Sequence, residues 1–310
     1  MSDPRLLIAA EIFPPAVGGP ATYAATLARE LPLRGWQLTV MLYGDANAGE
    51  YPATIVTIAR RGGPVGRYWR YLRTLWRLSK DFPLIYAQGP VSSGLPALIV
   101  AKLRRKKLVV KVTGDYAWEQ AFRAGATAVF IEAFQRQPVG GKYGWLRRIQ
   151  QYVCRRADAV VTPSAFLQGL VAGWGVPPGR IHVIPNAIPA PRVAEEREAL
   201  RRQFGIPLDA FVVVTAGRPV PWKGYGELAH AVIRWLRVQR GASVRLVVVG
   251  VTAAQFEAFA EAAGADEVAK HRDRITAVGP LPMIDVWRWL RAADVFVLNS
   301  AYEVLSHMTV

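Results

Sequence analysis

Short apolar runs alternate with helical patterns along almost the whole chain of 310 residues. This alternation constrains the fold more than any other feature, because it is typical of parallel sheets that are covered by helices on both faces. The strand candidates are continuously apolar, as strands buried on both sides are. We therefore predict an α/β fold. The predicted strands cover residues 5–10, 37–43, 84–87, 108–112, 159–162, 181–184, 211–215, 244–249, 275–278 and 295–298, and helices lie between most of them, for example at 21–34, 65–80, 225–240 and 283–292.

The chain is long enough for about two domains. Residues 184–191 are rich in proline and cannot form a helix interior or a central strand. A charged segment follows them. We therefore place the domain boundary there and expect two α/β domains, 1–190 and 191–310.

The composition excludes several classes of protein. Lys and Arg number 39 and Asp and Glu 23, so the formal net charge is +16, which favours anionic partners such as nucleotides or anionic lipids. The single cysteine, Cys154, cannot form an intramolecular disulfide or a thiolate zinc site, and it fits a reducing cytoplasm. We find no secretory signal and no apolar run long enough to span a membrane. A secreted disulfide scaffold and an integral membrane protein are therefore not expected.

Common catalytic motifs are missing from the sequence. It contains no phosphate loop of the G-x-x-x-x-G-K-[ST] type, no H-E-x-x-H metal helix, no G-x-S-x-G elbow and no Asp-x-Asp pair. The first strand is not followed by G-x-G-x-x-G, which disfavours a dinucleotide-dependent dehydrogenase. We therefore expect neither a bound metal nor a cofactor.

Two loops that follow predicted strands have residues suited to anions. Gly18 and Gly19 precede a helix start, where backbone N–H groups can face an anion, although an ordinary strand-to-helix loop would look the same. Arg218 and Lys223 follow the strand at 211–215, where ligands bind in open α/β sheets. A guanidinium fork and an ammonium could hold a diphosphate without a metal. The alternative is a solvated surface loop.

Two carboxylates also follow strands. Glu303 comes after the strand at 295–298, at the edge where Arg218 and Lys223 are expected, and it could accept hydrogen bonds from sugar hydroxyls. Asp115 comes after the strand at 108–112, with Glu119 beside it. A solvated carboxylate is the alternative for Glu303, and a helix N-cap is the alternative for Asp115.

Together these loops resemble the retaining glycosyltransferases of family 4 (group 1), which have the GT-B fold. The resemblance covers nearly the whole chain and rests on four segments, residues 14–19 (PPAVGG), 183–186 (VIPN), 217–224 (GRPVPWKG) and 293–300 (ADVFVLNS), followed by Glu303. It implies two Rossmann-like domains with a cleft between them and sugar transfer from a nucleotide-sugar without a metal.

The resemblance also implies residue roles. Gly18 and Gly19 would border the acceptor and the reacting sugar. Arg218 and Lys223 would bind the donor diphosphate and stabilise the leaving nucleotide. Glu303 resembles the first glutamate of the family's E-x7-E motif, which contacts the donor sugar. Asp115 lies where many members have a histidine, so Asp115 and Glu303 are the candidate catalytic residues.

The end of the sequence departs from the family pattern. The second glutamate of E-x7-E would fall one position after Val310, and Val304 stands where glycine is usual. The family's helix near Ser306 would be mostly missing. We therefore expect a second domain that is incomplete at its C-terminus, and a chain with little or no transferase activity.

A basic amphipathic helix is predicted at 65–80. Tyr68, Tyr71, Leu75 and Trp76 recur at helical spacing among five basic residues, and residues 102–107 add five more. The helix could lie on anionic lipid and bring the protein to a lipid-linked acceptor. Alternatively, its apolar stripe packs in the core.

Several functions remain open. The leading one is a cytoplasmic glycosyltransferase, with a nucleotide-sugar donor, a sugar or lipid-linked acceptor or a polysaccharide, and peripheral contact with the inner face of a membrane. The alternatives are a GT-B nucleotide-sugar epimerase, a phosphorylase and a non-catalytic fragment. The charge alone would suit nucleic acid, but the sequence has no recognisable nucleic-acid-binding motif, so we do not expect such a partner.

Overall fold

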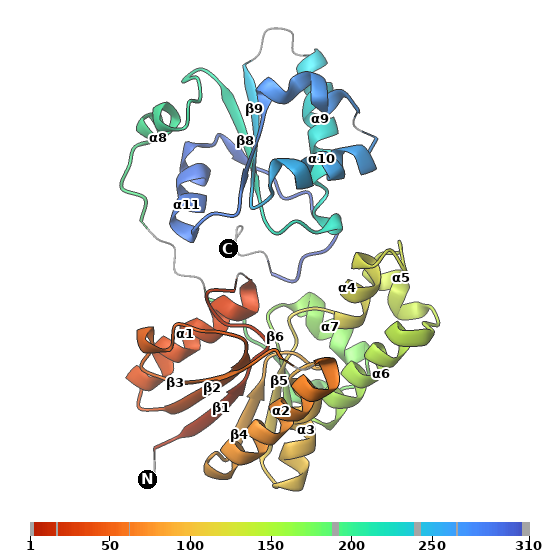
Figure 1. Cartoon of the computed structure of the whole chain (residues 1–310). Helices are drawn as coiled ribbons and strands as arrows, with labels where there is room; N and C mark the ends of the chain where they lie inside the picture. Colours follow the sequence, from red (N-terminus) through yellow and green to blue (C-terminus); the bar gives the residue numbers. More distant parts are fainter. Residues whose placement is uncertain are drawn as a thin grey trace. The chain divides into compact units, whose positions relative to one another are not determined.

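The computed structural model describes residues 3–16, 18–61, 63–187, 192–238, 243–264 and 266–305. This part of the chain forms two compact units, residues 3–187 together with 304–305, and residues 192–303. Each unit has its own parallel sheet with helices against both faces, as Figure 1 shows, which confirms the predicted fold class. The predicted boundary at residue 190 falls in a stretch outside the described residues.

The described strands of the first unit form a seven-stranded parallel sheet in the order β3-β2-β1-β4-β5-β6-β7. After β1 the chain adds β2 and β3 on one side, and it then returns to add β4 to β7 on the other side. The strand order therefore switches sides between β1 and β4. The elements are β1 (Arg5–Ala9), α1 (Gly19–Leu33), β2 (Gln37–Tyr43), β3 (Thr54–Ile58), α2 (Gly63–Leu78), β4 (Leu84–Ala87), α3 (Gly94–Leu103), β5 (Lys107–Lys111), α4 (Tyr116–Arg123), α5 (Ile131–Arg136), α6 (Gly141–Arg156), β6 (Ala159–Thr162), α7 (Ala165–Gly173) and β7 (Ile181–Val183).

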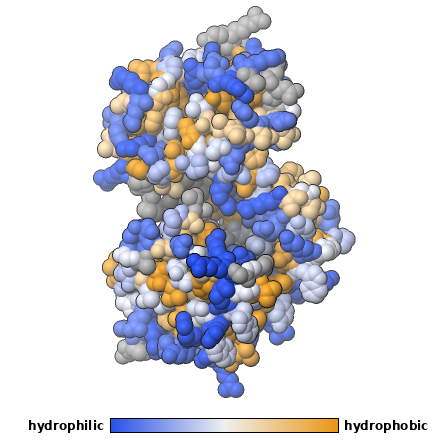
Figure 2. Space-filling model, in the orientation of Figure 1, coloured by the Kyte–Doolittle hydropathy of each residue, from blue (hydrophilic) through white to orange (hydrophobic). Residues whose placement is uncertain are grey.

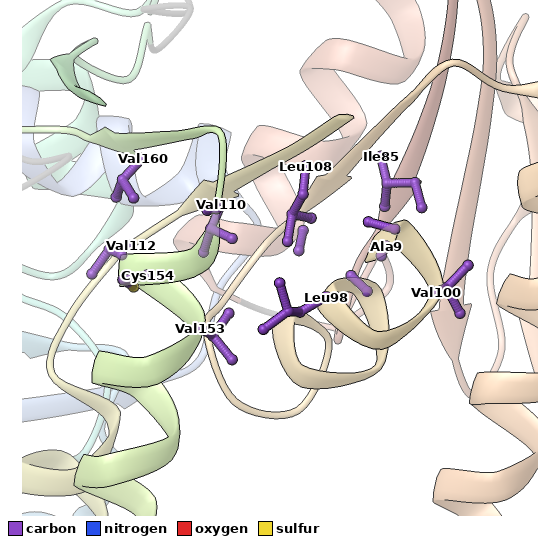
Figure 3. Packing of buried hydrophobic residues seen from close by; sticks show 14 of the residues in the cluster. Ala9, Ile85, Leu98, Val100, Leu108, Val110, Val112, Val153, Cys154 and Val160 are labelled. Carbon is purple, nitrogen blue, oxygen red and sulfur yellow. The ribbon is translucent and has the colours of Figure 1, made fainter. Parts of the chain in front are cut away.

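Two apolar layers cover this sheet. Strand side chains alternate between them, so that Ile85 and Ala87 of β4 face one layer while Tyr86 faces the other. Helix α1 packs in the layer that includes Tyr86. Helices α2, α3, α6 and α7 pack in the other layer, where Figure 3 shows Leu98 of α3 and Val153 of α6 among the strand residues. Burial on both faces accounts for the continuously apolar strands.

The second unit has a four-stranded parallel sheet among its described residues, in the order β10-β9-β8-β11. Helices α9 and α10 pack against one face. Helices α8 and α11 lie together, with the rings of Phe204 and Trp289 stacked 3.9 Å apart. The elements are α8 (Arg197–Gln203), β8 (Phe211–Ala216), η4 (Pro221–Lys223), α9 (Tyr225–Val238), β9 (Val244–Val249), α10 (Ala253–Ala262), η5 (Asp266–Arg274), β10 (Ile275–Gly279), α11 (Met283–Ala292) and β11 (Val295–Phe296).

Two strands differ from the sequence prediction. Strand β3 (Thr54–Ile58) was not predicted; it pairs only with β2 within the described sheet, and its outer residues are partly exposed. Strand β11 is shorter than the predicted 295–298 and pairs only with β8 among the described strands. A strand with one neighbour makes fewer ladder hydrogen bonds and is less buried. Its sequence is therefore less continuously apolar, and the strand itself can be shorter than predicted.

Candidate functional site

The described strands of each sheet run parallel, so the loops after their carboxyl ends gather at one edge, where open α/β sheets bind ligands. In the second unit the candidate residues lie in the loops after β8 and β11. In the first unit they lie in the loops after β1, β4 and β5.

The loop after β8 depends on close packing at Gly217, whose φ is +159°. A Cβ atom there would lie 3.0 Å from the hydroxyl of Tyr225 and 3.1 Å from Cε of Lys223. A Cβ atom on Gly250 would come within 2.4 Å of the Gly217 carbonyl oxygen. These two glycines therefore allow the ends of β8 and β9 to meet and leave room for the Lys223 side chain.

The segment after β11 is fixed to the same loop. Gly224 ends the short η4 helix in the left-handed region at φ +62°, and a Cβ atom there would lie 2.5 Å from Asn299 Nδ2. Asn299 Nδ2 donates to the Gly224 carbonyl at 2.9 Å, and the Ala301 amide donates to the Trp222 carbonyl at 2.8 Å. Two residues further on, this attachment places Glu303 against Lys223.

Lys223 and Glu303 form an ion pair. Their side chains are only 14% and 27% exposed, so water screens the pair less than it would at an open surface. Arg218 is exposed and has no ion-pair partner among the described residues. The structure thus brings the predicted lysine and glutamate into contact, and it places Arg218 in the same loop as the lysine.

Tyr225, the first residue of α9, holds the loop after β8 through a hydrogen bond. Burial, followed by the nearby Glu303 carboxylate, raises the pKa of Tyr225 above its ordinary value. Its phenol therefore stays protonated and donates to the Arg218 carbonyl at 3.2 Å. This hydrogen bond fixes the backbone at Arg218 while leaving the guanidinium exposed to solvent.

In the first unit, Gly18 is the N-cap of α1, with φ +156°. Its carbonyl accepts from the Thr22 amide at 3.0 Å, but no side chain caps the helix and its first turn has no acidic residue. Gly19 is the first residue of α1. The helix start therefore has the features of an anion-binding helix N-terminus. Val17, in the same predicted motif, lies outside the described residues.

Asp115 has a different setting from the one predicted for a catalytic group. Its carboxylate caps α4 by accepting from the Trp118 amide at 3.0 Å, and it also accepts from Gln150 at 2.8 Å and Gln135 at 2.7 Å. Asp115 is 0% exposed. The helix-capping alternative therefore describes this residue, and no surface of the carboxylate is left for a substrate in this arrangement.

Two buried polar residues at the same sheet edge were missed. Lys111, at the end of β5, is 0% exposed; its ammonium lies 3.2 Å from the centre of the Tyr23 ring and donates to Asn186 at 2.5 Å. Burial lowers the pKa of Lys111 to about 7. Gln88, after β4, is 4% exposed, and neither amide atom has a described hydrogen-bond partner. The available signal was a charged residue inside the otherwise apolar run at 108–112.

Glu11, directly after β1, was also missed. Its carboxylate accepts hydrogen bonds from the hydroxyl and amide of Ser92 and from the amide of Ser93, just before α3. Burial nevertheless dominates and raises the pKa of Glu11 from 4.5 to about 7. A Cβ atom on Gly89 would lie 2.7 Å from the carboxylate, so the glycine leaves space for it. Glu11 thus joins the loop after β1 to the start of α3.

This pKa predicts a pH dependence of stability. Between pH 4.5 and about 7, Glu11 keeps a proton in the folded protein that the unfolded chain has lost, so the stability of the first unit should fall as the pH rises through this window. Glu11→Gln removes the titrating group, and its thermal midpoint should fall less between pH 5 and 7.5. Glu30→Gln, at an exposed pair with Arg34, is the control and should behave as wild type. Equal slopes in wild type and Glu11→Gln would contradict this assignment.

No group of three or more His, Cys, Asp and Glu side chains among the described residues could hold a metal ion. No described helix is both long enough and apolar enough to cross a membrane.

Comparisons with protein families agree across both units. The model of Glycosyltransferase Family 4 matches residues 17–192, and the model of Glycosyl transferases group 1 matches residues 196–310. Among curated proteins, the D-inositol 3-phosphate glycosyltransferase of Xylanimonas cellulosilytica is 30% identical over 162 residues, which are 50% of this chain and 38% of that protein. The matched part is therefore less than half the length of that relative.

Solved structures share the fold. Sucrose-phosphate synthase from Thermosynechococcus elongatus superposes with a TM-score of 0.74 at 18% identity, covering 99% of this chain and 77% of that one. HepE from Anabaena, solved in complex with UDP-glucose, gives a TM-score of 0.72 at 18% identity, covering 98% of this chain and 76% of that one. At this level of identity the likeness concerns the fold alone.

Proposed function

Because this chain belongs to glycosyltransferase family 4, we propose that it transfers a sugar from a nucleotide-sugar donor to an acceptor, with retention of anomeric configuration. One observation supports this proposal more than any other. The loops after β8 and β11 place a guanidinium, an ammonium and a carboxylate at one sheet edge, with Lys223 and Glu303 in contact. Two cations can pair with the diphosphate of a nucleotide-sugar, and a carboxylate can accept hydrogen bonds from the hydroxyls of its sugar.

In this proposal, Arg218 and Lys223 bind the donor diphosphate. Negative charge grows on the diphosphate as the bond to the sugar breaks, and cations already in position stabilise that charge. The diphosphate would displace Glu303 from Lys223. The released carboxylate could then accept hydrogen bonds from sugar hydroxyls. The ion pair therefore keeps both side chains close to where the donor would need them.

The acceptor side of the proposal involves the first unit. The loop at Gly18 and Gly19 borders the acceptor and the reacting sugar, where the uncapped start of α1 favours a negatively charged or strongly polar group. We take the acceptor to be a lipid-linked sugar or a polysaccharide. A lipid-linked acceptor would bring the protein into peripheral contact with an anionic membrane.

Donor binding can be tested by calorimetry with UDP, GDP and ADP and with the matching monophosphates. We expect at least one diphosphate to bind at least about tenfold more tightly than its monophosphate, because only the diphosphate engages both cations. Arg218→Ala should weaken binding of that diphosphate about tenfold, whereas Arg234→Ala, at an exposed position of α9, should leave the affinity unchanged. If none of the diphosphates binds, the proposed donor site is wrong.

The same protein sample can distinguish a transferase from the main alternative, an epimerase. A nucleotide-sugar epimerase would convert the donor into its epimer without an acceptor. Proton NMR of a binding nucleotide-sugar incubated with the protein should show no epimer if the chain is a transferase. Accumulation of an epimer would favour the epimerase.

A further inference from the structure

Helix α2 has a second apolar stripe besides the one in the core. Tyr71 and Leu75 are 0% exposed and pack against one face of the first sheet. Val65, Trp69 and Trp76, on another side of the helix, are 83%, 64% and 40% exposed. Their spacing of four and seven residues puts them on one face. Core packing therefore explains only part of the amphipathic pattern.

The exposed stripe continues onto the end of α3. Leu103 is 69% exposed there. The Arg104 guanidinium lies 4.0 Å from the centre of the Trp76 ring, and Lys106 donates to the Lys80 carbonyl at 3.1 Å. These contacts join the two segments into one continuous area, which we call the α2/α3 surface.

Positive charge surrounds these apolar side chains. Asp81 is the only acidic residue between positions 63 and 107. Figure 2 shows strongly hydrophilic residues next to hydrophobic ones on the visible face of the first unit. The exposed basic residues of the α2/α3 surface are Arg67, Arg73, Arg77, Lys80, Lys102 and Arg105.

We propose that the α2/α3 surface docks on an anionic lipid bilayer, with Trp69, Trp76 and Leu103 among the headgroups and acyl chains. Tryptophan favours the membrane interface because one end of the ring is apolar and the other can donate a hydrogen bond. The surrounding cations would meet lipid phosphates. Nucleic acid would also attract the charge, but it offers no apolar layer for Leu103 and Val65. A bilayer offers both, so the charge and the apolar stripe favour it.

This inference deepens the proposed function, since it brings a lipid-linked acceptor within reach, but it can be tested separately. Co-sedimentation would use vesicles of phosphatidylcholine alone and of phosphatidylcholine with about a third phosphatidylglycerol. We expect binding to the anionic vesicles at least tenfold tighter, and weakened by salt. Trp69→Ser with Leu103→Ser should reduce it at least tenfold, as should Arg73→Gln with Arg77→Gln.

Trp145→Ser is the matched control. Trp145 is also 64% exposed and has Arg148 near its ring, but it lies on α6. It should bind vesicles as wild type does. Equal losses in Trp145→Ser and the α2/α3 variants would overturn the proposal, as would tighter binding to a single-stranded oligonucleotide than to anionic vesicles. All variants should keep the wild-type affinity for nucleoside diphosphate. If vesicles bind and no diphosphate does, the donor site fails while the docking surface stands.

Discussion

Replacing Arg201 with leucine should lower the free energy of unfolding of the second unit by about 3–5 kcal/mol, because it leaves a carboxylate without its buried partner. Arg201 is 4% exposed. Its guanidinium pairs with Asp294 at 2.6 Å and donates to the carbonyls of Ala292, Leu208 and Ala210 at 2.9–3.0 Å. Leucine fills part of the volume but satisfies none of these acceptors.

Asp294 would be left with fewer partners. Its burial by itself would raise its pKa, but hydrogen bonds from the Val212 amide, Arg197 and Arg201 outweigh that effect and hold the pKa of Asp294 below its ordinary value. The resulting stabilisation is present at neutral pH and is lost as the pH falls through the lowered pKa. The stability that Arg201→Leu loses relative to wild type should therefore be largest at neutral pH, and it should shrink as the pH falls below 3.8, the ordinary pKa of an aspartate.

Urea unfolding of both proteins measures this difference. Arg202→Ala is the control, because Arg202 is next in sequence but exposed, and pairs with Glu198 at 3.5 Å on the surface of the same helix. Exposed pairs of this kind contribute about 0.3–0.5 kcal/mol. A loss below about 1 kcal/mol in Arg201→Leu would mean that the network stabilises the unit far less than its burial indicates.

Arg201 also shows the limit of prediction from the sequence. A charged segment after the proline-rich stretch was visible, but nothing local indicated that one arginine in it is buried against a residue 93 positions later. The strands were predictable because burial on both faces of a parallel sheet produces continuous apolar runs. Strand β3 was missed because Thr54 and Thr57 interrupt its apolar pattern at a sheet edge.

The candidate site was predictable to a similar degree. Parallel strands end at one edge, so Arg218, Lys223 and Glu303, which follow two strands of the second domain, could be expected at the same edge of its sheet. Their pairing depends on Gly224 and Asn299, which bring two distant loops into contact. Asp115 shows the opposite case. Its position after a strand suggested chemistry, but the two glutamines that enclose it come from later helices.

Replacing Lys223 with methionine should weaken nucleoside diphosphate binding about 10- to 100-fold. A hydrogen bond to a charged group contributes about 1.5–3 kcal/mol, and methionine keeps the length of the side chain without the charge. The variant also leaves Glu303, now unpaired, close to where the diphosphate would bind. The loss should therefore exceed that of Arg218→Ala, whose guanidinium has no carboxylate partner among the described residues.

Glu303→Gln separates this explanation from simple damage to the loop. Without the competing carboxylate, Lys223 is free for the diphosphate, so UDP, or whichever diphosphate the wild type binds, should bind as tightly as before or more tightly. The matching nucleotide-sugar should lose its advantage over the diphosphate, because glutamine accepts hydroxyl hydrogen bonds less strongly than a carboxylate does. Calorimetry with both ligands, and with Arg234→Ala as control, measures the two effects. If Lys223→Met binds the diphosphate like wild type, the ammonium does not contact it. If Glu303→Gln weakens both ligands equally, the carboxylate supports the loop and does not recognise the sugar.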